Sequence, residues 1–350
     1  MLSLGGCFVF GVRFVKFTKQ PKRFDEQRTL VRTRGLAGGE DARLEQLFST
    51  TNYYRLSAYW YTFRQIDRTT GERGEQLSPG CTFDLVWDRY TFDRKLRLLA
   101  FDAIERIEVV VRTQLAYHHA HEHGPFGYVD DPDALPKLKG FPQQKARAEL
   151  MERIADETGR AEDEVFVRSF FKKHGDAHGH LPIWMATEIM GFRTLLTIFQ
   201  NCSKKVKNAI SSVFAVAPEI LSSWLLTLNT MRNVCAHHGR LWNREIGARP
   251  IVPTGTVYKA WNTPVPIKHD RMFASLTVLN YLVERVAPDD HWAAKFRALL
   301  DRHPTSPVKY MGFPENWTES PLWAGASIKL DEPPHPVALP EEHPFPTKAY

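Results

Sequence analysis

Cysteine is scarce in this sequence of 350 residues, which has four cysteines set far apart. No two of them have the spacing of a zinc site or of a secreted disulfide framework. Four histidines gather at 118–123, but metal sites usually take their ligands from separate elements. We therefore expect a protein of the reducing cytoplasm without a bound metal.

Long apolar runs are also missing. The segment Leu2–Val15 is interrupted by Arg13, has no basic region before it and is shorter than the roughly 18 apolar residues of a membrane helix. We interpret it as a leader outside the fold or as the product of an over-extended start codon. No other run approaches that length, so we expect no membrane partner.

No long stretch alternates apolar and polar residues as β-strands do, whereas helical periodicity dominates. We therefore predict an all-α fold, with a polar loop at 71–80. The longest predicted helix covers 92–119, where apolar residues such as Leu96, Ile104 and Val111 repeat at three- and four-residue steps. Further helices are predicted at 24–36, 40–49, about 204–214, 218–245, 270–286 and 290–301.

The order of these elements suggests how the chain is organised. We predict a leader at 1–20, an N-terminal helical region at 21–88 and a main helical domain at 89–302. The charged, helix-prone block at about 142–175 is interpreted as an insertion into that domain. Ten prolines among the last 47 residues forbid long helices, so 303–350 is predicted to be an extended, wrapping or disordered tail.

Lysine and arginine outnumber aspartate and glutamate by 46 to 40, and the formal charge of +6 favours a polyanionic partner. The surplus is clearest in two patches, Lys16, Lys19, Lys22, Arg23, Arg28, Arg32 and Arg34, and then Lys204, Lys205 and Lys207. Solvated helix faces are an equal alternative. The aromatic residues at 53–61 could stack unpaired bases, although core packing is the preferred interpretation.

The predicted helix at 221–245 has two contrasting faces. On an ideal helix of about 100° per residue, His238 falls within an apolar arc that also holds Trp224 and Met231. On the other side Asn233, His237, Arg240 and Arg244 form a polar stripe. Arg232 lies at the edge of the apolar arc, where a guanidinium needs a carboxylate or a phosphate as partner.

These residue types suit RNA cleavage. Imidazole can remove the proton of a ribose 2′-hydroxyl or protonate the departing oxygen, while arginine stabilises the charge that grows on phosphate. This chemistry uses the 2′-hydroxyl that DNA lacks and needs no metal or other cofactor. The alternative is an ordinary solvated helix face. Phosphate-binding glycine loops and nucleophile elbows are missing, so nucleotide hydrolysis and esterase activity have no support.

The stretch Leu226–Arg244, with Arg232-Asn233 and His237-His238, resembles the most recognisable segment of the Abi-like, abortive-infection proteins of the AbiD/AbiF type. Segments at 34–36, 52–60, 92–97, 107–112 and 182–188 resemble family segments in the same order, so the resemblance covers about 16–250. It implies a helical bundle of the HEPN superfamily. It also implies Arg232 and His237 as the catalytic pair and Asn233 as a polar assistant, while His238 also fits the spacing.

The resemblance implies a defence protein that cleaves RNA during phage infection. It implies a homodimer with a composite site, and a noncoding RNA or a protein antitoxin as regulator. Glu108, Arg112 and Glu188 would then support the site, although Glu108 and Arg112 fit a plain intrahelical pair slightly better. The rival hypotheses are a non-catalytic RNA-binding or scaffold module and a nuclease that acts on DNA.

Overall fold

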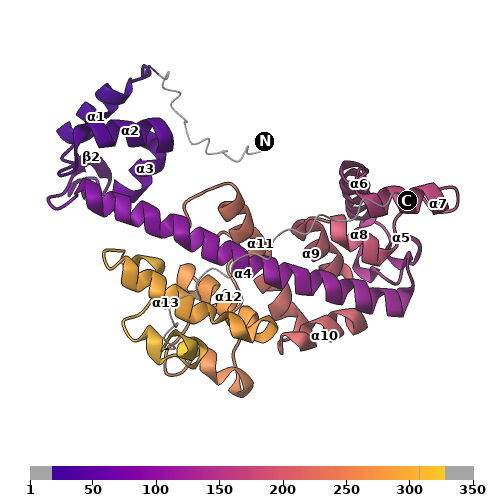
Figure 1. Cartoon of the computed structure of the whole chain (residues 1–350). Helices are drawn as coiled ribbons and strands as arrows, with labels where there is room; N and C mark the ends of the chain where they lie inside the picture. The colour runs from indigo at the N-terminus through magenta and orange to yellow at the C-terminus, as the bar shows by residue number, and fades with distance from the viewer. Residues whose placement is uncertain (1–17, 307, 328–350) are drawn as a thin grey trace, which may run out of the picture. The chain divides into compact units, whose positions relative to one another are not determined.

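The structure is a computed structural model that describes residues 18–306 and 308–327. Residues 1–17 of the predicted leader, with Lys16, and residues 328–350 of the predicted tail lie outside this range. The chain divides into two compact units, Met1–Trp87 and Asp88–Tyr350. Helices dominate the described part of each unit (Figure 1), which confirms the predicted all-α fold.

The first unit contains three short helices, α1 (Phe24–Thr33), α2 (Asp41–Thr51) and α3 (Tyr53–Trp60). The Arg32 guanidinium closes the turn between α1 and α2, because it donates to the carbonyl oxygen of Gly38 at 2.6 Å and pairs with Asp41. Such pairing neutralises much of the predicted N-terminal basic patch, since Arg23, Arg28 and Arg34 also contact carboxylates.

The aromatic stretch of this unit serves mainly as core. Tyr59 and Trp60 are buried, whereas Tyr54 is 76% exposed. A 3-10 turn, η1 (Tyr61–Phe63), follows α3. The preferred core-packing interpretation therefore applies to part of the stretch and leaves Tyr54 in solvent.

A β-hairpin follows in the first unit, and the sequence prediction missed it. Strand β1 (Arg64–Ile66) pairs antiparallel with β2 (Arg73–Leu77), which occupies half of the predicted 71–80 loop. Asp67 Oδ1 accepts two backbone N–H groups in the turn, and Gly71 there has a φ of +73°. The strands are mostly exposed, so they carry no alternation of apolar and polar residues that a pattern could detect.

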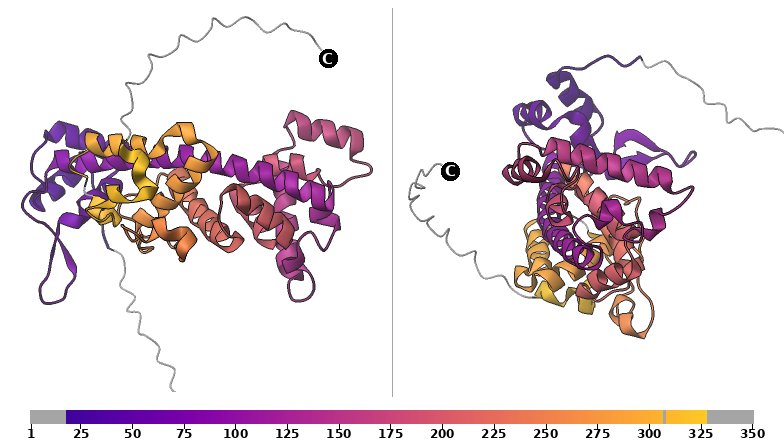
Figure 2. Two further views of the ribbon diagram at one scale, coloured as in Figure 1. Left: turned by 90° about the horizontal axis from the view of Figure 1, so that it is seen from below. Right: turned by 90° about the vertical axis from the view of Figure 1, so that its right-hand side faces the viewer.

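The second unit is built along α4 (Phe83–His123), which begins in the last residues of the first unit. Its predicted apolar face is buried, including Leu96, Ile104 and Val111. Figures 1 and 2 show other helices of this unit lying along α4. The backbone carbonyl of Leu99, for example, accepts the indole N–H of Trp292 at 3.1 Å.

The remaining elements of the second unit are, in chain order, α5 (Gly127–Asp130), η2 (Pro136–Leu138), α6 (Gln144–Arg160), α7 (Val165–His174), α8 (Ile183–Ile189), α9 (Phe192–Asn201), α10 (Lys204–Val213), α11 (Pro218–Ala236), η3 (Thr256–Trp261), α12 (Met272–Val286), η4 (Pro288–Asp290), α13 (Trp292–Arg302), η5 (Val308–Met311), η6 (Trp317–Glu319) and η7 (Pro321–Ser327). The block predicted as an insertion thus forms α6 and α7, and α6 packs on α8 and α9. Among the described helices, none is long and apolar enough on its own to cross a membrane, and only the bent pair α10 and α11 reaches that length and composition together.

Part of the predicted tail belongs to the packed core. Trp317 and Trp323 are buried, and Trp323 donates its indole N–H to Thr277 Oγ1 at 3.0 Å. Phe313 contacts the same cluster of rings, with its centroid 5.6 Å from that of Trp323. Residues up to 327 therefore help to close the second unit over α12 and α13.

Candidate active site

The candidate residues lie at the C-terminal end of α11, which is shorter than predicted. The helix ends at Ala236, because the N–H of Gly239 donates to the carbonyl of Val234 at 2.8 Å and that of His238 to Cys235 at 3.0 Å. This pair of bonds is a Schellman motif, a common way for a helix to end. The prediction of a helix that continues to about 245 is wrong, because it gave no weight to Gly239 as a stop signal.

His238 occupies the position of that motif which usually carries glycine. Its φ is +54°, in the left-handed region that L-residues rarely adopt. The side chain is exposed, so the expectation that His238 faces the core is also wrong. The physical reason is the same: beyond the C-cap residue His237 the chain no longer follows the 100° steps of a helix.

Arg232 lies on the last full turns of α11 and is half-buried. Its guanidinium carbon is 5.9 Å from the centre of the Phe101 ring on α4. Among the described residues it makes no ion pair within 4 Å. The predicted need for a carboxylate or phosphate partner is thus not met by a direct contact within the described chain.

Arg232 lines a cavity of about 320 Å³ between α4, α8 and α11. The other lining residues are Phe101, Glu105, Glu108, Val109, Arg112 and Glu188. The structure therefore brings together four of the predicted residues, Arg232, Glu108, Arg112 and Glu188. Three carboxylates face two guanidiniums there, so the cavity has an excess of one negative charge.

Arg112 holds the end of α8 in place. Its Nη1 atom donates to the carbonyl oxygens of Thr187 and Glu188, and Nη2 donates to Met190 at 3.1 Å. Nη2 also pairs with Glu108 on the preceding turn of α4 at 3.0 Å. The intrahelical pair is therefore present. Because the Arg112 guanidinium is bonded to α8 and to Glu108, Arg232 is the guanidinium of this cavity that is available to a ligand.

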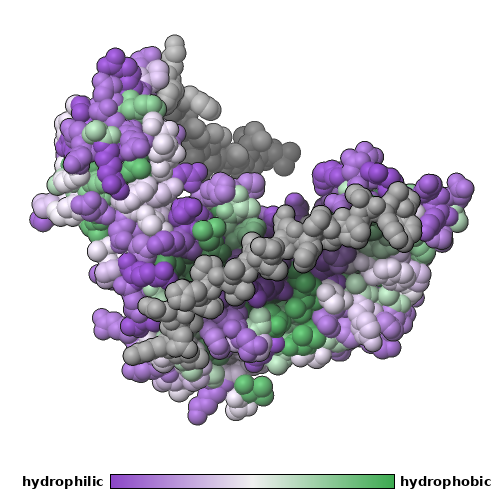
Figure 3. Space-filling view, in the orientation of Figure 1, coloured by the Kyte–Doolittle hydropathy of each residue, from purple (hydrophilic) through white to green (hydrophobic). Residues whose placement is uncertain are grey.

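Sequence reasoning missed three residues of this cavity, Phe101, Glu105 and Val109. Phe101 is 37% exposed and Val109 is 47% exposed, although both are apolar. Exposed apolar side chains are a minority on the face shown in Figure 3. The signal that could have found them is the pair of apolar residues, eight positions apart, on the otherwise polar side of α4.

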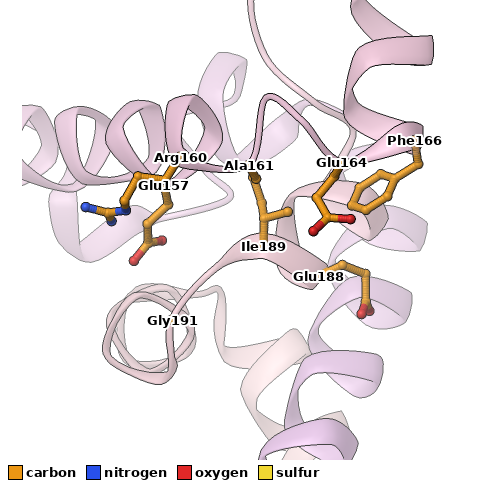
Figure 4. A pocket seen from close by; sticks show the side chains of 8 residues that line it. All are labelled: Glu157, Arg160, Ala161, Glu164, Phe166, Glu188, Ile189 and Gly191. Atoms are coloured by element: carbon orange, nitrogen blue, oxygen red, sulfur yellow. The ribbon is translucent and has the colours of Figure 1, made fainter.

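Glu188 also borders a second cavity, of about 600 Å³, beside the insertion helices. Figure 4 shows Glu157, Glu164 and Glu188 around it, together with the apolar side chains of Phe166 and Ile189. Glu157 accepts a hydrogen bond from Thr194 Oγ1 at 3.0 Å. Arg160 also lines this second cavity, which contains none of the predicted catalytic residues.

His237 and Asn233 are both exposed, and neither lines the cavity of Arg232. His237 is the C-cap of α11, so the ideal helix still applies to it and places it about 140° around the axis from Arg232. One copy of the chain thus presents Arg232 to the cavity and His237 to solvent on another side. Neither residue is sealed inside the second unit.

Arg240 and Arg244 lie beyond the end of α11, so their predicted alignment with Asn233 and His237 on one helical stripe is wrong. Arg240 is half-buried and Arg244 is exposed. The Arg244 guanidinium reaches back to the carbonyl of Arg240 at 3.5 Å. With His237 and His238 they form a short basic segment after the helix.

Two histidines of the cluster at 118–123, His119 and His123, are packed into the second unit. The described part of the chain has no group of three or more His, Cys, Asp or Glu residues that could hold a metal ion. His123 Nδ1 contacts Asp131 at 2.7 Å, and His119 is fully buried. Burial, with a smaller effect of His123, lowers the pKa of His119 to about 4.

The fold and the site thus define a helical protein that presents an arginine and a histidine, five positions apart, at the end of one helix. The model of the family described as "Abi-like protein" matches residues 46–243. The chain belongs to this family, and the match includes the whole of α11 and the segment that follows it. Comparison with curated proteins and with solved structures gives no significant match.

Proposed function

We propose that the protein is an abortive-infection endoribonuclease of the HEPN type, which cleaves RNA through its 2′-hydroxyl without a metal. The observation that supports this most is the placement of Arg232 and His237. Both stand at the end of α11 within reach of solvent, one beside a cavity and the other exposed. His237 removes the proton of the 2′-hydroxyl, which attacks the phosphorus, or protonates the 5′-oxygen that departs as the phosphodiester bond breaks. Arg232 stabilises the charge on the scissile phosphate.

The charges around Arg232 favour a site made by two copies of the chain. A phosphate beside one copy's Arg232 would face Glu105, Glu108 and Glu188, which repel it. The basic segment at 237–244 of a second copy would supply positive charge and the imidazole that this cavity lacks. We therefore propose a homodimer in which Arg232 of one copy and His237 of the other act on one phosphate.

Cleavage of RNA in excess EDTA by wild type, Arg232→Ala and His237→Ala tests the proposal. Each variant should lose about 10²- to 10⁴-fold in rate, and toxicity in cells should fall in parallel. Arg302→Ala and His269→Ala are matched controls, because both side chains are exposed and lie outside the site. If toxicity survives both site substitutions, the chain is a non-catalytic RNA-binding or scaffold module, which is the second candidate function.

Mixing the two inactive variants tests the composite site. After subunit exchange at equal amounts, about half of the dimers contain one copy of each variant, and each such dimer has one intact Arg232–His237 pair. Activity should return to about a quarter of wild type. No recovery on mixing would place both residues of the site in one copy.

The regulator is a further part of the proposal. A noncoding RNA or a protein antitoxin that covers the basic segment at 237–244 would keep the nuclease inactive until infection. To distinguish the two kinds of regulator, the chain is purified with its cell-derived partner and then treated with RNase or with protease. Release of activity by RNase treatment supports the noncoding RNA.

A further inference from the structure

A buried carboxylate on α4 holds the segment that follows the candidate histidine. Asp93 is fully buried, and its Oδ1 atom accepts the backbone N–H groups of Leu241 at 3.0 Å and Trp242 at 2.6 Å. Its Oδ2 atom pairs with the Arg97 guanidinium, one turn further along α4. The aspartate thus joins a loop and a helix that are 148 residues apart in sequence.

The contacts of Asp93 favour an ionised carboxylate. Two N–H groups converge on one oxygen, and a guanidinium that is itself only 7% exposed contacts the other. All of these donors lie in a dry part of the protein, where a charged acceptor binds them more strongly than a neutral one does. An amide in this place would keep the first oxygen but would turn an NH₂ group toward Arg97.

The carboxylate fixes the far end of a four-residue turn. At the near end, the Schellman bonds tie His238 and Gly239 to α11. At the far end, Leu241 and Trp242 are fully buried and held by Asp93. Only residues 237–240 lie between Ala236, where α11 ends, and Leu241, and His237 is the first of them.

The bonds to Asp93 add to the Schellman bonds in holding the left-handed backbone of His238. A left-handed φ in a residue other than glycine persists only where the surrounding structure holds it. Without the bonds from Leu241 and Trp242 the turn could relax, and His237 would change direction with it. A displacement of about 1 Å at a catalytic group can cost about a hundredfold in rate.

We propose that Asp93, oriented by Arg97, is a positioning residue of the nuclease site, which sets the direction of His237 by anchoring the turn at 237–240. This inference rests on the proposed function. Asp93 touches no RNA and takes no proton; it acts through the backbone of Leu241 and Trp242.

Asp93→Asn tests the inference, with kcat and KM for one RNA and amide hydrogen exchange of residues 237–242 as readouts. We expect kcat to fall at least about tenfold, with a smaller change in KM because Arg232 on α11 keeps its place. The amides of 237–242 should exchange faster than in the wild type. A folded variant with wild-type kcat would overturn the inference.

Asp290→Asn is the matched control. Asp290 is also a buried carboxylate, and it pairs with Lys295 at 2.8 Å and Arg106 at 3.4 Å, away from the turn at 237–240. Each variant removes the charge of one buried carboxylate that pairs with a cation, but only Asp93→Asn should lower kcat. An equal loss of kcat in Asp290→Asn would show a general loss of structure and would overturn the positioning role.

A second variant covers the case in which Asp93→Asn does not fold. Arg97→Lys keeps the positive charge beside Asp93 but loses the planar guanidinium, and a drop in kcat of a few-fold is expected; no drop would overturn the inference. A wild-type chain that cleaves no RNA would instead refute the proposed function. The exchange of the amides at 237–242 would then decide by itself whether Asp93 holds the turn.

Discussion

The left-handed residue at the end of α11 gives a prediction about stability with a definite sign. A non-glycine residue in this conformation costs about 1–2 kcal/mol, whereas glycine costs about 0.5–1 kcal/mol through the greater freedom of the unfolded chain. His238, at a φ of +54°, is exposed, so little packing is lost with its side chain. His238→Gly should therefore stabilise the protein by about 0.5–1 kcal/mol, which raises the thermal midpoint by about 1–4 °C.

The neighbouring histidine is the control for this prediction. His237 is also exposed, but its φ is −88°, which any residue adopts. The same substitution there, His237→Gly, should destabilise by about 0.5–1 kcal/mol. Calorimetry or urea unfolding of the two variants gives the two signs directly. If both variants shift in the same direction, the Schellman turn is not formed as described and the reasoning fails.

Two further predictions concern the scaffold. Arg112→Gln removes a charged donor from three carbonyls at the end of α8 and should cost about 2 kcal/mol in urea unfolding. Asp102→Asn, which breaks only the exposed pair Arg106–Asp102, should cost less than about 0.5 kcal/mol; equal costs would contradict this. Burial first, and then His123, lower the pKa of His119 to about 4, while Asp131 raises it. His119 therefore binds a proton more readily in the unfolded chain than in the folded one. The stability that neutral His119 contributes above pH 6.5 is lost as the pH falls toward 4. His119→Leu should weaken the pH dependence of the free energy of unfolding between pH 6.5 and 4.5. If the slope of that free energy against pH is the same as in the wild type, the low pKa assigned to His119 is contradicted.

The helical fold could be predicted because its signals are local. The apolar repeat of α4 follows the 3.6-residue period, and its members Leu96, Ile104 and Val111 are buried as expected. The hairpin β1–β2 escaped because its strands are short and exposed, and burial is what creates a strand pattern. The contribution of Trp317 and Trp323 to the core was also hidden, since proline-rich sequence reveals an absence of long helices but not where short turns pack.

The candidate site was predictable in composition but not in shape. The sequence pairs Arg232 with His237, and the structure keeps both at the end of α11. The segment after α11 is held at Leu241 and Trp242 by Asp93, which lies 148 residues before Leu241. The periodicity of apolar residues contains no information about such a long-range contact. The sequence prediction therefore continued the helix through the turn. The cavity beside Arg232 could not be predicted from periodicity either, because its walls come from three separate helices.

In the proposed mechanism, His237 assists the attack of a ribose 2′-hydroxyl on the neighbouring phosphate of the RNA. The most direct measurement compares, in excess EDTA, one RNA with the same RNA carrying a single 2′-deoxynucleotide at a mapped cleavage position. We predict that wild type leaves a 2′,3′-cyclic phosphate on the normal RNA and fails at the deoxy position, and that His237→Ala cleaves at least about 10² times more slowly. Cleavage at the deoxy position, or an undiminished rate with His237→Ala, would contradict the account.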